Sequence, residues 1–142
     1  MYIADGKTNG PAFSWPDGKR IAVMVTFDYD AEFLRISRAK SKGTSIGFTD
    51  FSRGQYGPHE GLARCLDMLD TMNIKSTFFV PGAVIETYLD TVEEIHRRGH
   101  ELACHGYRHE SDPELSRDEM IKILDKSEAL LAEITGKKPV GH

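Results

Sequence analysis

Two carboxylates follow a strongly apolar segment in the first quarter of the chain. Residues 20–27 are mostly apolar and β-branched, and Asp28 and Asp30 come directly after them. In an extended backbone, side chains two positions apart point to the same side, so both carboxylates can face one cavity. Their negative charges repel each other, and a bound cation relieves that repulsion. An Asp pair that only caps a turn at the end of a strand is the simpler alternative.

Two histidines follow another short apolar segment, residues 101–104. His105 and His109 are four positions apart, which lets two imidazoles reach one metal ion if the segment makes a turn. Two surface histidines also occur at this spacing by chance. Together with Asp30, however, they form a set of one carboxylate and two imidazoles that leaves coordination positions open for water and substrate. The sequence therefore predicts a divalent metal site at Asp30, His105 and His109.

Other side chains that can do chemistry have simpler structural explanations. Cys104 precedes His105, so in a strand the two side chains point in opposite directions, and Cys104 is expected in the core. Helix ends, helix starts and turns explain most of the remaining histidines, and the last residue of the chain is not assigned to the site. These histidines are His59, His96, His100 and His142.

The elements that must position these residues alternate between strands and helices. Short apolar runs predict strands at 20–27, 75–80 and 101–104, with the start of a fourth at 138–140. Apolar residues spaced three and four apart predict helices from about 58 to 72, from 85 to 98 and from 116 to 136. A capping box, Ser116 to Glu119, opens the third helix, and Gly136 ends it. This alternation predicts an α/β domain with a parallel sheet.

Residues 33–57 show no clean periodicity. We expect a long loop over the end of the first strand, with at most one short helical turn, since long segments of this kind are usually functional. Five basic residues in this segment favour an anionic substrate, although a solvated charged loop explains them more simply. They are Arg35, Arg38, Lys40, Lys42 and Arg53.

Length and composition exclude several classes of protein. The 142 residues suit one domain, and 18 Lys and Arg against 22 Asp and Glu argue against a nucleic-acid partner. No apolar run approaches the roughly 18–20 residues of a membrane span. The polar, irregular segment 1–20 does not resemble a signal peptide, and two cysteines fit a reducing compartment. We therefore expect a cytoplasmic protein.

Four motifs in order resemble the polysaccharide deacetylase family: Thr26–Glu32, Phe78–Gly82, Gly99–Glu101 and His105–Glu110. The Asp-x-Asp-Ala-Glu form, the Arg53–Gly57 stretch and the Val-Pro-Gly tripeptide are more similar to one branch. That branch contains peptidoglycan deacetylase-like proteins and the related cyclic-imide and allantoin hydrolases. The resemblance implies an α/β fold that is a partial (β/α) barrel of the polysaccharide deacetylase type.

The same resemblance implies metal-dependent hydrolysis of non-peptide carbon–nitrogen amide bonds. Asp28 matches the catalytic base of the family, and Asp30, His105 and His109 match its metal ligands, with zinc as the expected ion. Allantoin-hydrolysing members lack the full ligand set, so its retention here favours the other members. Two later family motifs, which carry an arginine partner for the base and a general-acid histidine, have no counterpart. We therefore expect residues 1–142 to form a single incomplete catalytic domain that self-associates or is completed by a C-terminal half.

Three alternatives remain open at this point. The substrate is a small molecule or an N-acetyl sugar, and a cyclic imide or ring amide is favoured by the absence of a signal peptide. A metal-retaining binding module without turnover is consistent with the missing motifs. The ligand set alone also suits a mononuclear iron oxygenase, although the other motifs argue against it.

Overall fold

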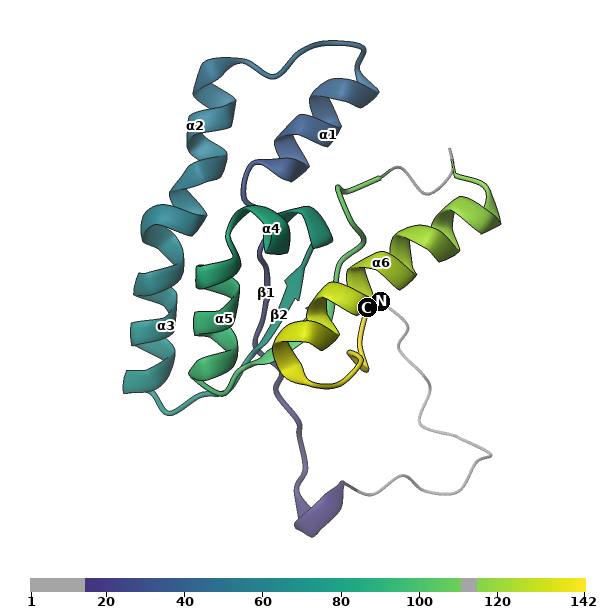
Figure 1. Ribbon diagram of the computed structural model, residues 1–142. Coiled ribbons are helices and arrows are strands. Elements are labelled where there is room, and N and C mark those ends of the chain that lie inside the picture. Colours follow the sequence, from purple (N-terminus) through teal and green to yellow (C-terminus); the bar gives the residue numbers. More distant parts are fainter. Residues whose placement is uncertain (1–14, 111–114) are drawn as a thin grey trace, which may run out of the picture.

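A parallel three-stranded sheet forms the centre of the molecule. The computed structural model describes residues 15–110 and 115–142 (Figure 1). Most of the segment 1–20, which does not resemble a signal peptide, lies outside the described residues. The strands are β1 (Thr26–Asp28), β2 (Thr77–Val80) and β3 (Glu101–Cys104), in the order β1-β2-β3. Helices connect the strands, as right-handed crossovers between parallel strands require. The predicted α/β class with a parallel sheet is confirmed.

The register of the sheet brings the carboxyl ends of the strands to one edge. Asp28 is paired with Phe79, and Val80 is paired with Cys104. The residues that follow β1 and β3, including Asp30 and His105, therefore emerge on the same side of the molecule. Ligands bind at this edge in parallel α/β folds, because side chains from several strands converge there.

The described residues also form six α-helices and two shorter helical segments. Their bounds are η1 (Pro16–Gly18), α1 (Phe33–Ser41), α2 (Phe48–Tyr56), η2 (Gly57–Gly61), α3 (Leu62–Thr71), α4 (Gly82–Thr87), α5 (Leu89–Arg97) and α6 (Arg117–Thr135). The core is apolar and fully enclosed, with Phe78 and Val80 of β2 packed among Leu66, Leu69 and Leu131 of the helices. None of the described helices is both long and apolar enough to span a bilayer.

The predicted helix 116–136 is confirmed at both ends. The hydroxyl of Ser116 accepts a hydrogen bond from the Glu119 backbone, and the Glu119 carboxylate accepts one from the Ser116 backbone, which completes the capping box. Gly136 adopts a φ of 73°, and its N–H donates to the carbonyl of Ala132. The predicted helix 85–98, by contrast, consists of α4 and α5. Tyr88 interrupts it with a φ of −129° and ψ of 44°.

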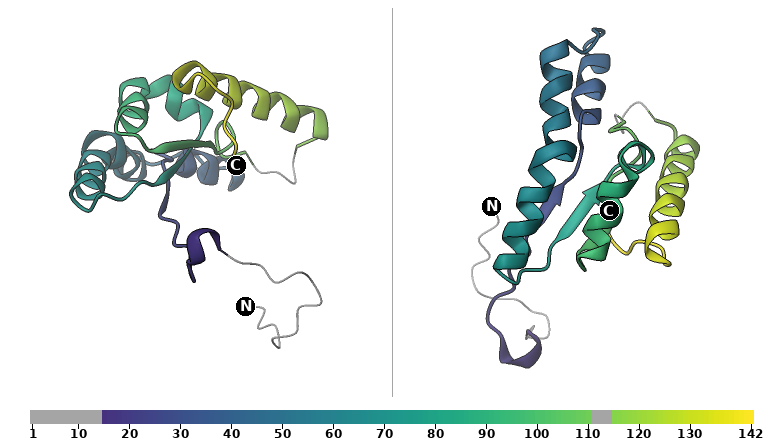
Figure 2. Two further views of the ribbon diagram at one scale, coloured as in Figure 1. Left: turned by 90° about the horizontal axis from the view of Figure 1, so that it is seen from below. Right: turned by 60° about the vertical axis from the view of Figure 1, so that its left-hand side comes forward.

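The expectation of a long loop over residues 33–57 is wrong. This segment forms α1 and α2. Helix α2 continues through η2 into α3, so that α2, η2 and α3 run end to end (Figures 1 and 2). Gly54 lies at the contact between α2 and the start of α1, where an added Cβ would be 2.4 Å from the Glu32 Cα. Gly43, with a φ of 66°, follows the end of α1. Gly54 allows close packing and Gly43 allows a helix to end, so glycines in this segment do not indicate a loop.

The predicted strand 20–27 is shorter than expected. Ile21, Val23 and Met24 are 77%, 82% and 87% exposed, and pairing with β2 begins only where the Thr77 N–H donates to the Val25 carbonyl. Since β2 starts at Thr77, the residues before Val25 have no partner strand among the described residues. The predicted fourth strand at 138–140 is not a strand in the structure. Its neighbour Gly141 nevertheless accepts a hydrogen bond from the Cys104 N–H at 3.0 Å, beside β3.

Candidate metal centre

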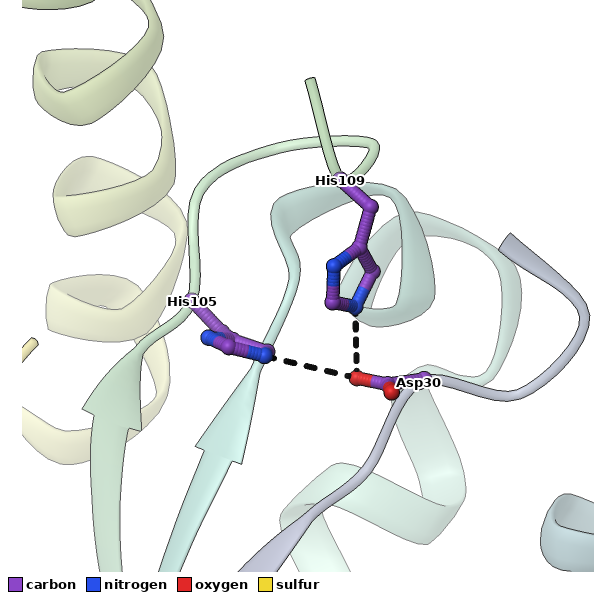
Figure 3. Close-up of side chains that lie close together, drawn as sticks. All are labelled: Asp30, His105 and His109. Atoms are coloured by element: carbon purple, nitrogen blue, oxygen red, sulfur yellow. Dashed lines mark hydrogen bonds and ion pairs between the residues drawn. The ribbon is translucent and has the colours of Figure 1, made fainter. Parts of the chain in front are cut away.

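Asp30, His105 and His109 converge at the carboxyl edge of the sheet (Figure 3). The Oδ1 atom of Asp30 lies 2.7 Å from Nε2 of His109 and 3.6 Å from Nε2 of His105. One ligand atom from each residue lies within 4.8 Å of the other two. All three side chains are largely buried, with exposures of 15% to 28%. The three predicted ligands are therefore brought together.

The segment after β1 is fixed by Tyr29, which lies between the two aspartates. Its N–H donates to the Phe79 carbonyl at 2.8 Å, and its ring is buried in the core. Its hydroxyl forms a 2.8 Å hydrogen bond with the hydroxyl of Thr91, and burial raises its pKa to about 12. Because successive side chains in an extended segment alternate in direction, the inward Tyr29 turns Asp28 and Asp30 away from the core.

The loop that carries the histidines is held by helix α4. The N–H groups of Gly82 and Ala83 donate to the carbonyls of Gly106 and Tyr107 at 3.0 and 2.9 Å. Ser37 of α1 donates its hydroxyl to the carbonyl of His109. His109 itself has a φ of 57°, a conformation that is uncommon for residues other than glycine. This unusual backbone directs the imidazole of His109 toward Asp30.

The donor set fits a divalent ion. Two ligand atoms bound to a tetrahedral zinc ion lie about 3.3 Å apart, since zinc–nitrogen and zinc–oxygen bonds are about 2.0–2.2 Å long. The separation of 3.6 Å between His105 and Asp30 is close to this value, and the 2.7 Å contact of His109 is a hydrogen bond that must lengthen when an ion binds. Burial, with a smaller contribution from His109, lowers the pKa of His105. This shift favours the neutral imidazole that can bind a metal.

Asp28 lies beside the three ligands and outside their cluster. It is the last residue of β1, is exposed, and lines a cavity of about 230 Å³ together with Asp30. It is near enough to His105 for its charge to act on the imidazole. This position is compatible with the role of a base next to a metal, as predicted.

Two residues of the site were missed in the sequence. His142 lines a second cavity, of about 180 Å³, with His105 and His109. The place of His142 directly after the expected fourth strand could have indicated this, because the preceding residue, Gly141, lies beside the end of β3. Glu32 is 5% exposed, and the Tyr88 hydroxyl donates to its carboxylate, with the two oxygens at 3.1 and 3.0 Å. No local pattern indicates that a glutamate next to the Asp pair is buried.

Most residues with structural explanations behave as expected; His59 does not, because it lies inside the continuous run of α2, η2 and α3 and not at a helix start. Cys104 is 2% exposed in the core, and burial raises the pKa of its thiol. His100 is buried at the turn before β3, and its Nδ1 accepts a hydrogen bond from the Ser76 N–H at 3.2 Å. His96 is exposed in the last turn of α5, and His59 lies in η2 with its ring edge-on to Tyr88. None of these four belongs to the metal-ligand cluster.

Comparison with known families agrees with this geometry. The family model for polysaccharide deacetylase matches residues 16–142. The chain belongs to the polysaccharide deacetylase family. Within this family, it is 34% identical to the peptidoglycan deacetylase-like protein FGM2 of Gibberella zeae over 125 residues, which are 87% of this chain and 36% of that protein. It is also 34% identical to the peptidoglycan deacetylase of Helicobacter pylori over 124 residues, 87% of this chain and 41% of that protein.

A solved structure extends the comparison to the fold of this chain. A candidate polysaccharide deacetylase from Mycobacterium smegmatis superposes with a TM-score of 0.79 at 40% identity, over 92% of this chain and 46% of that chain. The family predicted from the four motifs is therefore confirmed. The chain spans less than half the length of each of these three proteins.

Proposed function

We propose that this chain carries the metal-binding and base residues of an amide hydrolase that deacetylates N-acetyl sugars. The observation that carries the proposal is the convergence of Asp30, His105 and His109, with Asp28 next to them. The names of the curated relatives, a peptidoglycan deacetylase and a deacetylase-like protein, support this substrate class.

Each residue has a distinct part in the proposed reaction. His105 and His109 each offer an imidazole nitrogen, and Asp30 offers a carboxylate oxygen, so the three would hold one divalent ion, with zinc expected. When bound, such an ion lowers the pKa of a water toward about 7 and polarises the scissile carbonyl. Asp28 accepts the proton of the attacking water as the general base. Proton transfer to the leaving nitrogen is not assigned to any residue in the described part of the chain.

A cyclic imide or ring amide is the second candidate substrate. The Asp28-Tyr29-Asp30-Ala31-Glu32 form, which resembles the branch with cyclic-imide hydrolases, favours it. Both substrates require the same attack of water on a carbonyl carbon bonded to nitrogen, so the metal and base residues serve either one.

Zinc binding tests the proposed function directly. Zinc is titrated by calorimetry into the metal-stripped chain and into His105→Ala, His109→Ala and His96→Ala variants, the last as a control on the surface of α5. One ion per chain is expected for the wild type and for His96→Ala. Either ligand variant should lose more than the roughly 10–100-fold in affinity that removal of an outer-shell partner costs. Unchanged zinc binding in the ligand variants contradicts the site assignment.

Turnover separates the substrates and the binding-module alternative. Release of acetate from N-acetylglucosamine oligomers supports the deacetylase, and opening of succinimide supports the ring hydrolase. These reactions are measured on a version of the chain extended to the length of its relatives, because no described residue is assigned to protonate the leaving nitrogen. Stoichiometric zinc with neither reaction in that longer chain favours a metal-retaining binding module.

A further inference from the structure

A cavity beside the two aspartates is lined by three arginines from α1 and α2. Asp28 and Asp30 form one side of this cavity of about 230 Å³, and Arg35, Arg38 and Arg53 also line it. His105 and His109 line the other cavity, next to apolar residues of α6 that include Met120 and Leu124. Asp30 therefore lies between an arginine-lined space and a more apolar one.

The fold places these arginines at the carboxyl end of β1. Helix α1 begins just beyond that end, and α2 packs alongside α1 (Figures 1 and 2). Arg35 and Arg38 are one turn apart on α1 and so share a face. The close contact of Gly54 with Glu32 brings α2, and with it the neighbouring Arg53, to the same cavity.

The arginines are only partly neutralised by protein carboxylates. Arg35 and Arg53 share one oxygen of Asp50, at 3.3 and 3.9 Å, and both remain exposed. Arg38 makes no hydrogen bond or ion pair within the described ranges 15–110 and 115–142. Glu32 is unavailable to them, since it is buried and accepts hydrogen bonds from Tyr88.

With a divalent ion bound at Asp30, the charge of the cavity suits a negatively charged ligand. The three arginines are balanced by Asp50, Asp28 and Asp30. A divalent ion held by Asp30 therefore leaves an excess of positive charge. Lys42, which lines the adjoining cavity with Arg35 and Arg38, adds to this excess. Arginine binds carboxylates through a planar pair of N–H donors, which gives geometric specificity as well as attraction.

We propose that the arginine-lined cavity binds a carboxylate of the substrate, so that this protein acts on acidic amides in preference to neutral ones. The inference rests on the proposed function for the position of the scissile amide next to Asp28 and Asp30. Arg38, the arginine without a partner, is the main contact, and Arg53 is the second.

A pair of probes that differ only in charge tests this inference. Succinamate carries an amide and a carboxylate, and its methyl ester carries the same amide without the charge. Both are titrated by NMR into the zinc-loaded and the metal-free chain. The chain variants are Arg38→Gln, Arg53→Gln and, as a matched control, Arg64→Gln. Arg64 is an exposed arginine of α3 that pairs with Glu60 and does not line the cavity.

The expected result is a preference for succinamate over its ester of roughly tenfold to a hundredfold, the range of a charge-assisted contact. Arg38→Gln should remove most of the preference, Arg53→Gln part of it, and Arg64→Gln none. Equal affinity for the two probes, or an equal loss in the Arg64→Gln control, overturns the inference. Tighter binding of methyl phosphate than of succinamate overturns the assignment to a carboxylate.

Zinc calorimetry on the same preparations separates this inference from the proposed function. Arg38→Gln should leave zinc stoichiometry unchanged, because Arg38 is not a ligand. A chain that fails to bind zinc contradicts the proposed function, while the probe titrations on the metal-free chain still report on the arginines.

Discussion

Asp28 and Asp30 are two positions apart and face the same side of β1, yet their surroundings differ. Asp30 is 15% exposed and touches both histidines, whereas Asp28 is exposed and contacts neither imidazole within ion-pair distance in the described part of the chain. A carboxylate held between two imidazoles is suited to ligation, and a free carboxylate beside them is suited to proton transfer. The roles proposed for the two residues follow from this difference.

This difference predicts opposite outcomes for two isosteric substitutions. Asp28→Asn should retain zinc and lower amide turnover by roughly 10²–10⁴-fold, because it removes a general base and keeps the shape of the side chain. Asp30→Asn should lose zinc affinity, because it removes the charged ligand. Metal content and rate are measured on the same preparation. Loss of zinc in parallel with activity in Asp28→Asn would identify Asp28 as a ligand.

At the scale of elements, the crossing of α2 over the start of α1 depends on Gly54. A Cβ at this position would lie 2.4 Å from Cα and 2.7 Å from Cβ of Glu32, and backbone atoms cannot move aside as a flexible side chain can. Gly54→Ala should therefore lower the free energy of unfolding by about 1–3 kcal/mol or more, the usual cost of overpacking. Urea unfolding measures this. Gly47→Ala is the control, with nothing within 4 Å of its added Cβ, and a similar loss there would contradict the steric explanation.

The capping box of α6 makes the stability of the folded chain depend on pH. Hydrogen bonds from the side chain and backbone of Ser116 lower the pKa of Glu119. Because the folded-state pKa is below the unfolded one, the stabilisation is present above the unfolded pKa and is lost as pH falls through the lowered folded-state value. Ser116→Ala should cost about 1 kcal/mol at neutral pH through loss of the N-cap. Urea midpoints between about pH 3 and 7 should show a weaker acid dependence in Glu119→Gln, and an unchanged profile would contradict this.

At the scale of the whole molecule, the metal site joins segments that are distant in the sequence. Asp30 follows β1, whereas both histidines follow β3, with β2 between these strands. An ion bound by all three residues therefore binds the folded state and not the unfolded chain. Binding of this kind stabilises the fold in proportion to the logarithm of the free ion concentration.

Zinc should raise the midpoint of thermal unfolding of the metal-stripped chain. At 100 times the dissociation constant, the expected stabilisation is about 2.7 kcal/mol. A chelator should reverse the shift, and His109→Ala should abolish it, while His96→Ala should retain it. Circular dichroism at several zinc concentrations measures the effect. An equal shift in His109→Ala would show that zinc binds elsewhere.

The sequence by itself predicted the alternation of the three strands with helices from residue 58 onward, and it named Asp30, His105 and His109 as candidate ligands. These features depend on local rules: apolar periodicity, the capping box at Ser116, and side chains that directly follow buried strands. The family followed from four short motifs that lie at the same places. Parallel pairing requires the carboxyl ends of the strands to meet, so the sequence pattern alone groups Asp30, His105 and His109.

Only the tertiary structure decided what the segment 33–57 does, because its helices are short, are stabilised by packing, and are separated by glycines that are equally compatible with a loop. Gly54 lets α2 pack closely against Glu32, which is more than 20 residues away in the sequence. A local sequence pattern contains no information about this contact. The length of β1 was decided in the same way, since Ile21 to Met24 have strand-forming side chains but no partner strand among the described residues. The burial of Glu32 and the grouping of three arginines beside Asp28 likewise depend on which elements meet, and the sequence specifies this only through the complete fold.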